Sequence, residues 1–330
     1  MSRPASLLPD GARLFMTGGT GFIGLSLLRA ALDPARALLA EDARITVLSR
    51  SPQRFLAQHP EFARVPRLEL IQGEVRSFAF PPGQFSHVIH AATDTSAEAM
   101  ARPRALIDEI VSGTARVLEF AGRCGAKAVL LTSSGAVYGP QPRDVERLEE
   151  TYPGAPDPAD PASAYGQAKR LAEQLCAIAF HEAGLAVKVA RLFAFVGEDL
   201  PLDAHYAVCN FIRDALGAPA IDVHGDGSPL RSYLYAGDLA LWLLTILDRG
   251  TPNRPYNVGS DEAISVADLA RLVADIVSPG KPVRIAAKRP DHAGRLRYVP
   301  SVARATNELG LRVSTPLAEA IRRTAACHRR

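Results

Sequence analysis

The segment Thr17-Gly18-Gly19-Thr20-Gly21-Phe22-Ile23-Gly24 separates a short apolar run at 13–16 from a helical pattern at 22–32. Its glycines fit two spacings, GxGxxG at positions 19, 21 and 24 and GxxGxxG at positions 18, 21 and 24. Such a turn lets the backbone approach a pyrophosphate closely, and the first amides of the following helix face the anion. The segment therefore predicts a dinucleotide site, and a plain glycine turn is the alternative.

Short apolar runs alternate with longer helical patterns on both sides of this motif. Strands that are apolar on both faces and alternate with helices predict a parallel sheet covered by helices on both sides. We expect an α/β fold, a doubly wound parallel sheet of Rossmann type with a smaller C-terminal lobe. The expected strands are 13–16, 45–48, 68–71, 87–90, 128–131 and 187–191, and the expected helices are 22–32, 104–124 and 165–183.

The alternation becomes irregular after about residue 192, which predicts a second domain. We expect a dinucleotide-binding domain at 1–191 with a return segment at about 228–262, and a substrate-binding lobe at 192–227 and 263–330. The proline-rich stretch 152–161 is typical of a surface loop. Ser265 and Asp268 form a capping box for a helix that ends at Val277, and Pro316 suits the first turn of the last helix.

Composition excludes several classes of protein. The chain has 330 residues, 47% of them apolar, and a net charge of +3, so it can bury a core but has no strong field for nucleic acid or an anionic membrane. No apolar run is long enough for a membrane span, and residues 1–15 show no signal-peptide pattern, so we expect a cytoplasmic protein. The four cysteines lack metal spacing and are typical of a reducing compartment. Only five of the 38 basic residues are lysines; this arginine bias indicates either codon preference or planar groups that bind phosphate.

Tyr165 and Lys169 are four residues apart in a predicted helix, so their side chains share one face. A free tyrosine has a pKa near 10, and an adjacent ammonium favours its phenolate, so Lys169 would lower the Tyr165 pKa and make it a usable acid and base. The pair predicts proton-transfer chemistry and a lysine that can also bind the nicotinamide ribose. A packed aromatic beside an exposed lysine is the alternative.

Ser134 follows the predicted strand 128–131, at the edge where parallel sheets bind ligands. Its hydroxyl could donate to an oxygen that gains charge during hydride transfer. The second strand ends in Ser49 and Arg50, where NAD enzymes usually have a carboxylate for the ribose. We therefore favour NADP over NAD, because Arg50 could bind a 2′-phosphate; a solvated loop arginine is the alternative.

The glycine segment, SSGAVYG at 133–139 and PASAYGQAK at 161–169 together resemble the extended short-chain dehydrogenase/reductase superfamily, in its NAD-dependent epimerase/dehydratase family. The resemblance covers nearly the whole chain and implies a nucleotide-diphosphate sugar as substrate. It implies that Tyr165 is the general acid and base, that Lys169 is its electrostatic partner, and that Ser134 polarises the sugar hydroxyl. It also implies homodimerisation through the helices 104–124 and 165–183.

The resemblance also implies the binding residues. Those expected at the cofactor are Gly18, Gly21, Phe22, Ile23, Gly24, Ser49, Arg50, Glu74, Val75, Ala91, Ala92, Tyr165 and Lys169. Those expected at the substrate are Ser134, Asn210, Arg231 and either Arg289 or Arg295, where guanidinium groups suit a diphosphate. No metal ligands are expected. Asp238 matches an aspartate of the family whose role is more often structural.

Two departures from the family limit the chemistry. The 4,6-dehydratases of the family place Asp-Glu after the catalytic hydroxyl, and the decarboxylases keep the Glu, whereas this chain has Gly135 and Ala136. Simple hydride and proton exchange remains, so we expect a 4-keto reductase ahead of a 4-epimerase with retained NAD. Ala194 and Ile110 replace asparagines that are frequent in the family, which indicates an altered substrate pose. The sequence also leaves open a dinucleotide sensor without turnover and a reductase of non-sugar carbonyls.

Overall fold

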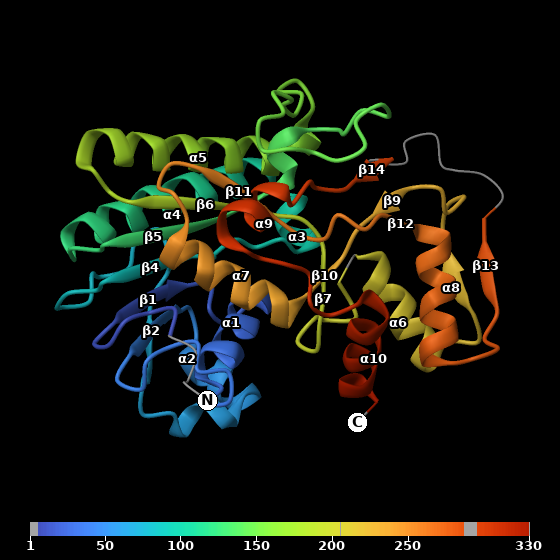
Figure 1. The fold of residues 1–330 in the computed structure, drawn as a ribbon, viewed down its shortest axis with the longest axis horizontal. Coiled ribbons are helices and arrows are strands. Elements are labelled where there is room, and N and C mark those ends of the chain that lie inside the picture. The colour runs from blue at the N-terminus through green and yellow to red at the C-terminus, as the bar shows by residue number, and fades with distance from the viewer. Residues whose placement is uncertain (1–5, 205, 287–295, 330) are drawn as a thin grey trace. The chain divides into compact units, whose positions relative to one another are not determined.

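The computed structural model describes residues 6–204, 206–286 and 296–329 (Figure 1). The chain divides into two compact units. Unit 1 comprises Met1–Val137, Asp157–Arg191 and Ala240–Tyr256, and unit 2 comprises Tyr138–Pro156, Leu192–Leu239 and Asn257–Arg330.

These boundaries differ from the expected ones in two places. The return segment of unit 1 is shorter than the expected 228–262, and residues 138–156 belong to unit 2. The latter stretch joins unit 2 because the Leu148 amide donates to the Val299 carbonyl over 2.9 Å and the Tyr138 hydroxyl donates to Asn257 over 2.7 Å.

A seven-stranded sheet with the order β11-β6-β5-β4-β1-β2-β3 forms the centre of the fold (Figure 1). β1 pairs in parallel with β2 and β4, β2 pairs in parallel with β3, and β4 with β5. The strands are β1 (Arg13–Thr17), β2 (Arg44–Ser49), β3 (Leu68–Gln72), β4 (His87–His90), β5 (Ala128–Ser134), β6 (Val187–Leu192) and β11 (Pro255–Val258). The expected doubly wound parallel sheet is confirmed.

Helices α4 and α5 pack together on one face of this sheet, and α1 lies on the other (Figure 1). The helical elements of this part are α1 (Phe22–Leu32), α2 (Pro52–Gln58), η1 (Pro60–Arg64), α3 (Ala97–Met100), α4 (Pro103–Arg123), η2 (Gly135–Tyr138), η3 (Pro161–Ser163), α5 (Ala164–Ala183) and α7 (Ala236–Arg249). The chain passes between the units within α7 and again within β11.

Aromatic packing holds α4 onto the sheet. Phe15 of β1 is fully buried, and its ring centroid lies 4.5 Å from that of Phe120 on α4 and 5.5 Å from that of Phe78. Aromatic rings bury large apolar areas, and tilted pairs at such distances add favourable quadrupole contacts. The core beneath α4 therefore holds β1 in place, and β1 leads directly into the glycine segment.

The described residues of unit 2 form short strands and several helices. Its elements are β7 (Phe195–Val196), α6 (Ala207–Gly217), β8 (Ile221–Val223), β9 (Leu230–Arg231), β10 (Leu234–Tyr235), β12 (Ile264–Ser265), α8 (Val266–Val277), β13 (Val283–Ile285), β14 (Arg297–Tyr298), α9 (Ala303–Leu309) and α10 (Leu317–His328). The expected cap of α8 is confirmed, because the Ser265 hydroxyl oxygen accepts the Asp268 amide over 3.0 Å. Within the described ranges, no helix has the length and apolar character that a membrane crossing requires.

Candidate functional site

The carboxyl ends of three neighbouring strands meet at one edge of the sheet. β1 ends at Thr17, which is in register with His90 at the end of β4, and β5 is the next strand along. The glycine segment follows β1, Ala91 and Ala92 follow β4, and Ser134 is the last residue of β5. The sheet thus brings three of the predicted motifs to the same edge, where parallel α/β sheets bind their ligands.

Two glycines of the loop are required by the protein's own packing. Gly18 has a φ of +72°, and a Cβ there would lie 2.3 Å from the Ala91 carbonyl oxygen. A Cβ at Gly24 would lie 2.2 Å from the Gly18 carbonyl oxygen. Such distances are far below any contact that a side chain tolerates, so both positions exclude other residues.

Gly21 differs from its neighbours, because a Cβ there would have no protein atom nearer than the Gly18 carbonyl oxygen at 3.6 Å. It is also the N-cap of α1, with an ordinary φ of −88°, and no side chain caps the helix. The first amides of a helix lack partners within the helix and carry its positive end. The absence of any close contact at Gly21, before the amides of Phe22, Ile23 and Gly24, fits the pyrophosphate of a dinucleotide.

The residues predicted at the adenosine end lie after β2 and β3. Ser49 is buried and its hydroxyl accepts the Ser51 amide over 3.2 Å, whereas Arg50 is exposed. The Glu74 carboxylate accepts hydrogen bonds from the Arg76 amide and guanidinium at 3.1 and 3.2 Å. Val75 packs against Gly113 of α4, where a Cβ would lie 3.1 Å from its Cγ1.

Asp94, which the sequence did not single out, lies near Arg50. Desolvation raises the Asp94 pKa, but hydrogen bonds from Ser96 and the charges of Arg50 and Arg102 outweigh it and lower that pKa. The Ser96 amide donates to Asp94 Oδ1 over 2.9 Å. The end of β2 therefore has two guanidinium groups and one carboxylate in its surroundings.

Lys169 is a buried lysine with fixed partners. Its side chain is 3% exposed, and its Nζ donates to Thr93 Oγ1 and to the Thr132 carbonyl, each over 2.8 Å. The same Nζ lies 6.0 Å from the ring centroid of Tyr165, one turn earlier on α5. Burial lowers the pKa of Lys169 to about 8, against the charge of Glu173, which raises it. The amine is therefore mostly protonated near neutral pH and lies close to the tyrosine.

Ser134 is buried at the end of β5, and its Oγ accepts the Ala136 amide over 3.1 Å. Among the residues that the structure describes, no group accepts the Ser134 hydroxyl proton. That proton is thus available to an oxygen atom of a ligand. Gly135 and Ala136, in η2, place no carboxylate beside it.

The buried His90 side chain forms hydrogen bonds beneath this edge of the sheet. Its Nδ1 lies 2.8 Å from Thr17 Oγ1 and its Nε2 lies 3.1 Å from Thr114 Oγ1 on α4. Burial and the nearby charge of Lys169 lower the pKa of His90 to about 3. The imidazole is therefore neutral and connects β1, β4 and α4.

Two of the residues predicted to bind the sugar nucleotide lie in unit 2, whereas Ser134 lies in unit 1. Asn210 lies on α6 and Arg231 ends β9, and both are partly buried. The Arg231 guanidinium donates to the Leu230 carbonyl over 2.8 Å. Arg289 and Arg295 lie outside the described residues. Asp238 accepts the amides of Ser314 and Thr315 at 3.0 and 2.8 Å, which is a structural contact.

Sequence reasoning missed four residues around Lys169 and Ser134. These are Thr93, Thr132, Glu173 and Arg191. A weak signal existed for two of them, since Thr132 precedes Ser133 in the quoted motif and Glu173 is one helical turn after Lys169. The other two lie in the loop after β4 and on β6, so only the fold brings them here.

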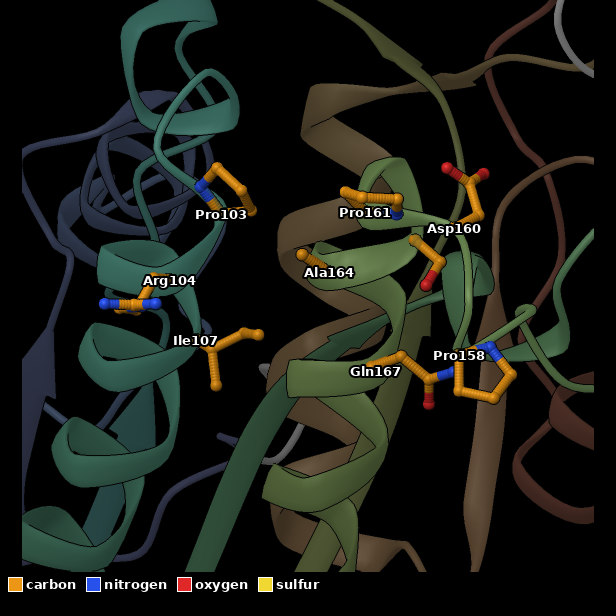
Figure 2. A pocket seen from close by; sticks show the side chains of 9 residues that line it. Pro103, Arg104, Ile107, Pro158, Asp160, Pro161, Ala164 and Gln167 are labelled. Carbon is orange, nitrogen blue, oxygen red and sulfur yellow. The ribbon is translucent and has the colours of Figure 1, made fainter.

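A separate pocket of about 360 Å³ lies where α4 and α5 begin (Figure 2). Figure 2 shows Pro103 and Ile107 of α4 on one side and Pro161 and Ala164 of η3 and α5 on the other. Its remaining lining residues are Arg104, Pro158, Asp160, Ser163 and Gln167. None of the predicted catalytic or cofactor residues lines it.

Comparison with known proteins supports the geometry. The family model described as NAD dependent epimerase/dehydratase family matches residues 14–259. UDP-glucuronic acid decarboxylase 1 of Danio rerio is 28% identical over 316 residues, which cover 96% of this chain and 72% of that protein.

Two solved structures share the fold. A dTDP-glucose 4,6-dehydratase from Streptomyces venezuelae, determined with NAD bound, has a TM-score of 0.83 at 24% identity and covers 96% of this chain and 97% of its own. UDP-N-acetylglucosamine 4-epimerase from Methanobrevibacter ruminantium has a TM-score of 0.82 at 18% identity. The match covers 97% of this chain and 99% of that structure's chain. At these identities the likeness shows the architecture alone.

Proposed function

The chain belongs to the NAD dependent epimerase/dehydratase family, and on this premise we propose that it transfers a hydride at C4 of a nucleotide-diphosphate sugar. We place a 4-keto reductase first and a 4-epimerase second. A nicotinamide dinucleotide would supply the hydride acceptor or donor. The uncrowded Gly21, where a Cβ would have only an ordinary contact with the Gly18 carbonyl oxygen, is the feature before the first turn of α1 that fits its pyrophosphate.

The observation that carries the proposal is the buried Lys169 amine, held by Thr93 and Thr132 beside Tyr165. In the reducing direction, the Tyr165 hydroxyl would donate its proton to the sugar oxygen, and the Lys169 ammonium would stabilise the phenolate that remains. The Ser134 hydroxyl would donate a hydrogen bond to the same oxygen as it gains charge.

The residues beside Ser134 favour hydride exchange over elimination or decarboxylation. Gly135 and Ala136 offer no side chain that could move a proton at C5 or C6 of the sugar. The curated relative from Danio rerio is a UDP-glucuronic acid decarboxylase and the similar structure from Streptomyces venezuelae is a dehydratase. We therefore propose that this chain has kept the redox step of such enzymes without the second step.

Arg50 supports NADP as the cofactor of a reductase. Its guanidinium is exposed after β2, and a guanidinium group suits a 2′-phosphate. Replacement of Arg50 by alanine should weaken binding of NADPH at least about tenfold more than binding of NADH, which equals 1.4 kcal/mol. Fluorescence titration with both nucleotides measures this, and equal losses would remove the argument for NADP.

The epimerase alternative rests on the similar structures, one of which is a 4-epimerase and another of which was determined with NAD bound. An epimerase retains NAD, because the same hydride returns to the opposite face of the sugar. Mass spectrometry of the supernatant after denaturation of the purified protein distinguishes the two. Stoichiometric NAD in that supernatant would reject the reductase in favour of the epimerase.

The substrate can be found by a thermal-shift screen of UDP-, dTDP-, GDP- and CDP-sugars, followed by NAD(P)H oxidation with the matching 4-keto sugar. A ligand at about 100 times its dissociation constant adds about 2.7 kcal/mol to the apparent free energy of unfolding. We expect one nucleotide class to stabilise the protein and its 4-keto sugar to be reduced. Absence of a shift with all four classes would contradict a nucleotide-sugar substrate.

We also propose a homodimer formed through α4 and α5. Leu171 and Ile178 lie seven residues apart on α5, two helical turns, and are 50% and 40% exposed. An exposed apolar stripe of this kind is typical of a surface that a second copy covers. Light scattering of the wild type should give twice the chain mass, and Leu171→Glu combined with Ile178→Glu should give the monomer mass.

A further inference from the structure

Glu173 forms a partly buried ion pair next to the candidate catalytic pair. It lies on α5, one turn after Lys169, and its carboxylate accepts hydrogen bonds from the Arg191 guanidinium at 2.7 and 3.0 Å. The Ser133 hydroxyl donates to the same carboxylate over 2.5 Å. The side chains of Glu173 and Arg191 are only 16% and 14% exposed.

These contacts tie α5 to two strand ends. Ser133 directly precedes Ser134 on β5, and Arg191 lies near the end of β6, the neighbouring strand. Lys169 ties the same helix to β5 through the Thr132 carbonyl. Two successive residues of β5 are thus held by two successive turns of α5, just before Ser134.

Among the described groups, Glu173 is the carboxylate whose charge raises the pKa of Lys169 against the effect of burial. His90 of β4 is neutral because burial lowers its pKa to about 3. Burial raises the pKa of the Cys176 thiol to about 12, so that thiol stays protonated. Tyr165 is the group that Lys169 would assist, and the Arg191 cation pairs with Glu173 over 2.7 Å.

We propose that Glu173 is a positioning residue of the reaction, which holds Ser134 through Ser133 and keeps the Lys169 amine charged beside Tyr165. The proposal rests on the proposed oxidoreductase function. A merely structural ion pair would hold α5 against the sheet without influencing the charge of Lys169. The two roles are separable, because Glu173→Gln keeps an acceptor for Ser133 but removes the negative charge that Lys169 and Arg191 share.

The test is a pH titration of lysine Cε chemical shifts by NMR, on the full chain labelled with ¹³C-lysine. The five lysines give five signals, and Lys169→Arg assigns that of Lys169. We expect Glu173→Gln to move the Lys169 midpoint to lower pH by about one unit, since loss of an adjacent opposite charge destabilises the ammonium. Lys188, which donates to the Leu247 carbonyl, is the internal control and should keep its midpoint. An unmoved Lys169 midpoint would overturn the proposal.

Three further measurements make the test decisive. With an active substrate, the alkaline limb of the kcat/KM profile of Glu173→Gln should move to lower pH by the same amount, and a limb that stays in place would overturn the catalytic role. Ser133→Ala should lower kcat without moving the Lys169 midpoint. Glu150→Gln removes the carboxylate that pairs with Arg304 in unit 2 and should change neither readout.

Folding and function failures remain distinguishable. If Glu173→Gln does not fold, Glu173→Asp withdraws the carboxylate by one methylene and should shift the Lys169 midpoint in the same direction by a smaller amount; no shift would overturn the proposal. If the wild type reduces or epimerises no nucleotide sugar, the proposed function fails. The titration of Lys169 then decides the role of Glu173 on its own.

Discussion

At the residue scale, the glycine segment separates positions that the fold needs from a position that a ligand needs. A Cβ at Gly18 or Gly24 would overlap backbone atoms, whereas a Cβ at Gly21 would have only an ordinary contact, with the Gly18 carbonyl oxygen at 3.6 Å. A sequence motif gives all of these glycines equal weight. Only their surroundings show that the absence of a side chain at Gly21 has no explanation in the protein's own packing.

Replacement of Gly21 by alanine should therefore leave stability unchanged while it weakens binding of the dinucleotide at least about tenfold. Its φ of −88° suits any residue, so no backbone strain arises. Gly24→Ala should instead lower the free energy of unfolding by about 1–3 kcal/mol or prevent folding, because its Cβ would overlap the Gly18 carbonyl oxygen. Thermal unfolding and NAD(P)H fluorescence titration of both variants measure this contrast. Normal binding by Gly21→Ala would argue against a pyrophosphate at this turn.

A second prediction at this scale concerns the Ser134 hydroxyl, whose proton no described group of the protein accepts. Ser134→Ala should lower kcat about 10²–10³-fold, the usual loss when a donor to a developing oxyanion is removed. Ser134→Thr keeps a hydroxyl and should recover part of the rate, measured by NAD(P)H absorbance with the substrate from the screen. A Ser134→Ala enzyme with wild-type kcat would show that the hydroxyl does not contact the reacting oxygen.

At the element scale, β1, β4 and α4 share one buried imidazole. His90 contacts Thr17 and Thr114 and stays neutral, whereas in the unfolded chain it has an ordinary pKa near 6.5. The unfolded state therefore binds more protons than the folded state between about pH 6.5 and pH 3, and the free energy of unfolding falls as the pH falls through that window.

Protonation of His90 in the unfolded chain should therefore, by itself, lower the free energy of unfolding by about 2 kcal/mol between pH 7 and pH 5. Urea denaturation of His90→Gln at both pH values checks it. The variant should be less stable than wild type at pH 7, because the contacts to Thr17 and Thr114 are altered, but its stability should change less with pH. An equal loss in both proteins would show that other groups cause the acid sensitivity.

Four central strands of unit 1 were predictable, because β1, β2, β4 and β5 are mostly buried and each has a run of apolar residues. Tyr165, Lys169 and Ser134 were predictable for a similar local reason, since helical spacing and a strand end fix their relative positions. Thr93 was not, because its contact with Lys169 joins residues 76 apart in the chain. The two-residue strands of unit 2, such as β9 and β10, were also beyond prediction, since so few residues carry no periodicity.

At the scale of the whole molecule, the net charge of +3 gives no field that attracts a polymer, and the candidate roles for arginine are local. Unit 1 contains the residues proposed for the dinucleotide and for proton transfer. Unit 2 contains Asn210 and Arg231, which are proposed for the diphosphate of the sugar nucleotide. Because the contacts to the diphosphate are assigned to unit 2 and the contacts to the dinucleotide to unit 1, substitution of Arg231 should separate the two binding events.

Arg231→Ala should reduce the thermal stabilisation by the sugar nucleotide and leave that by the dinucleotide unchanged. Charge-assisted hydrogen bonds contribute about 1.5–3 kcal/mol, so the affinity should fall about tenfold or more. Arg213→Ala removes an exposed guanidinium of α6 and should change neither shift. If Arg231→Ala left binding of every nucleotide sugar unchanged while Tyr165→Phe abolished reduction of a small ketone, the sugar assignment would fail. The same catalytic pair would then serve a carbonyl substrate that carries no diphosphate.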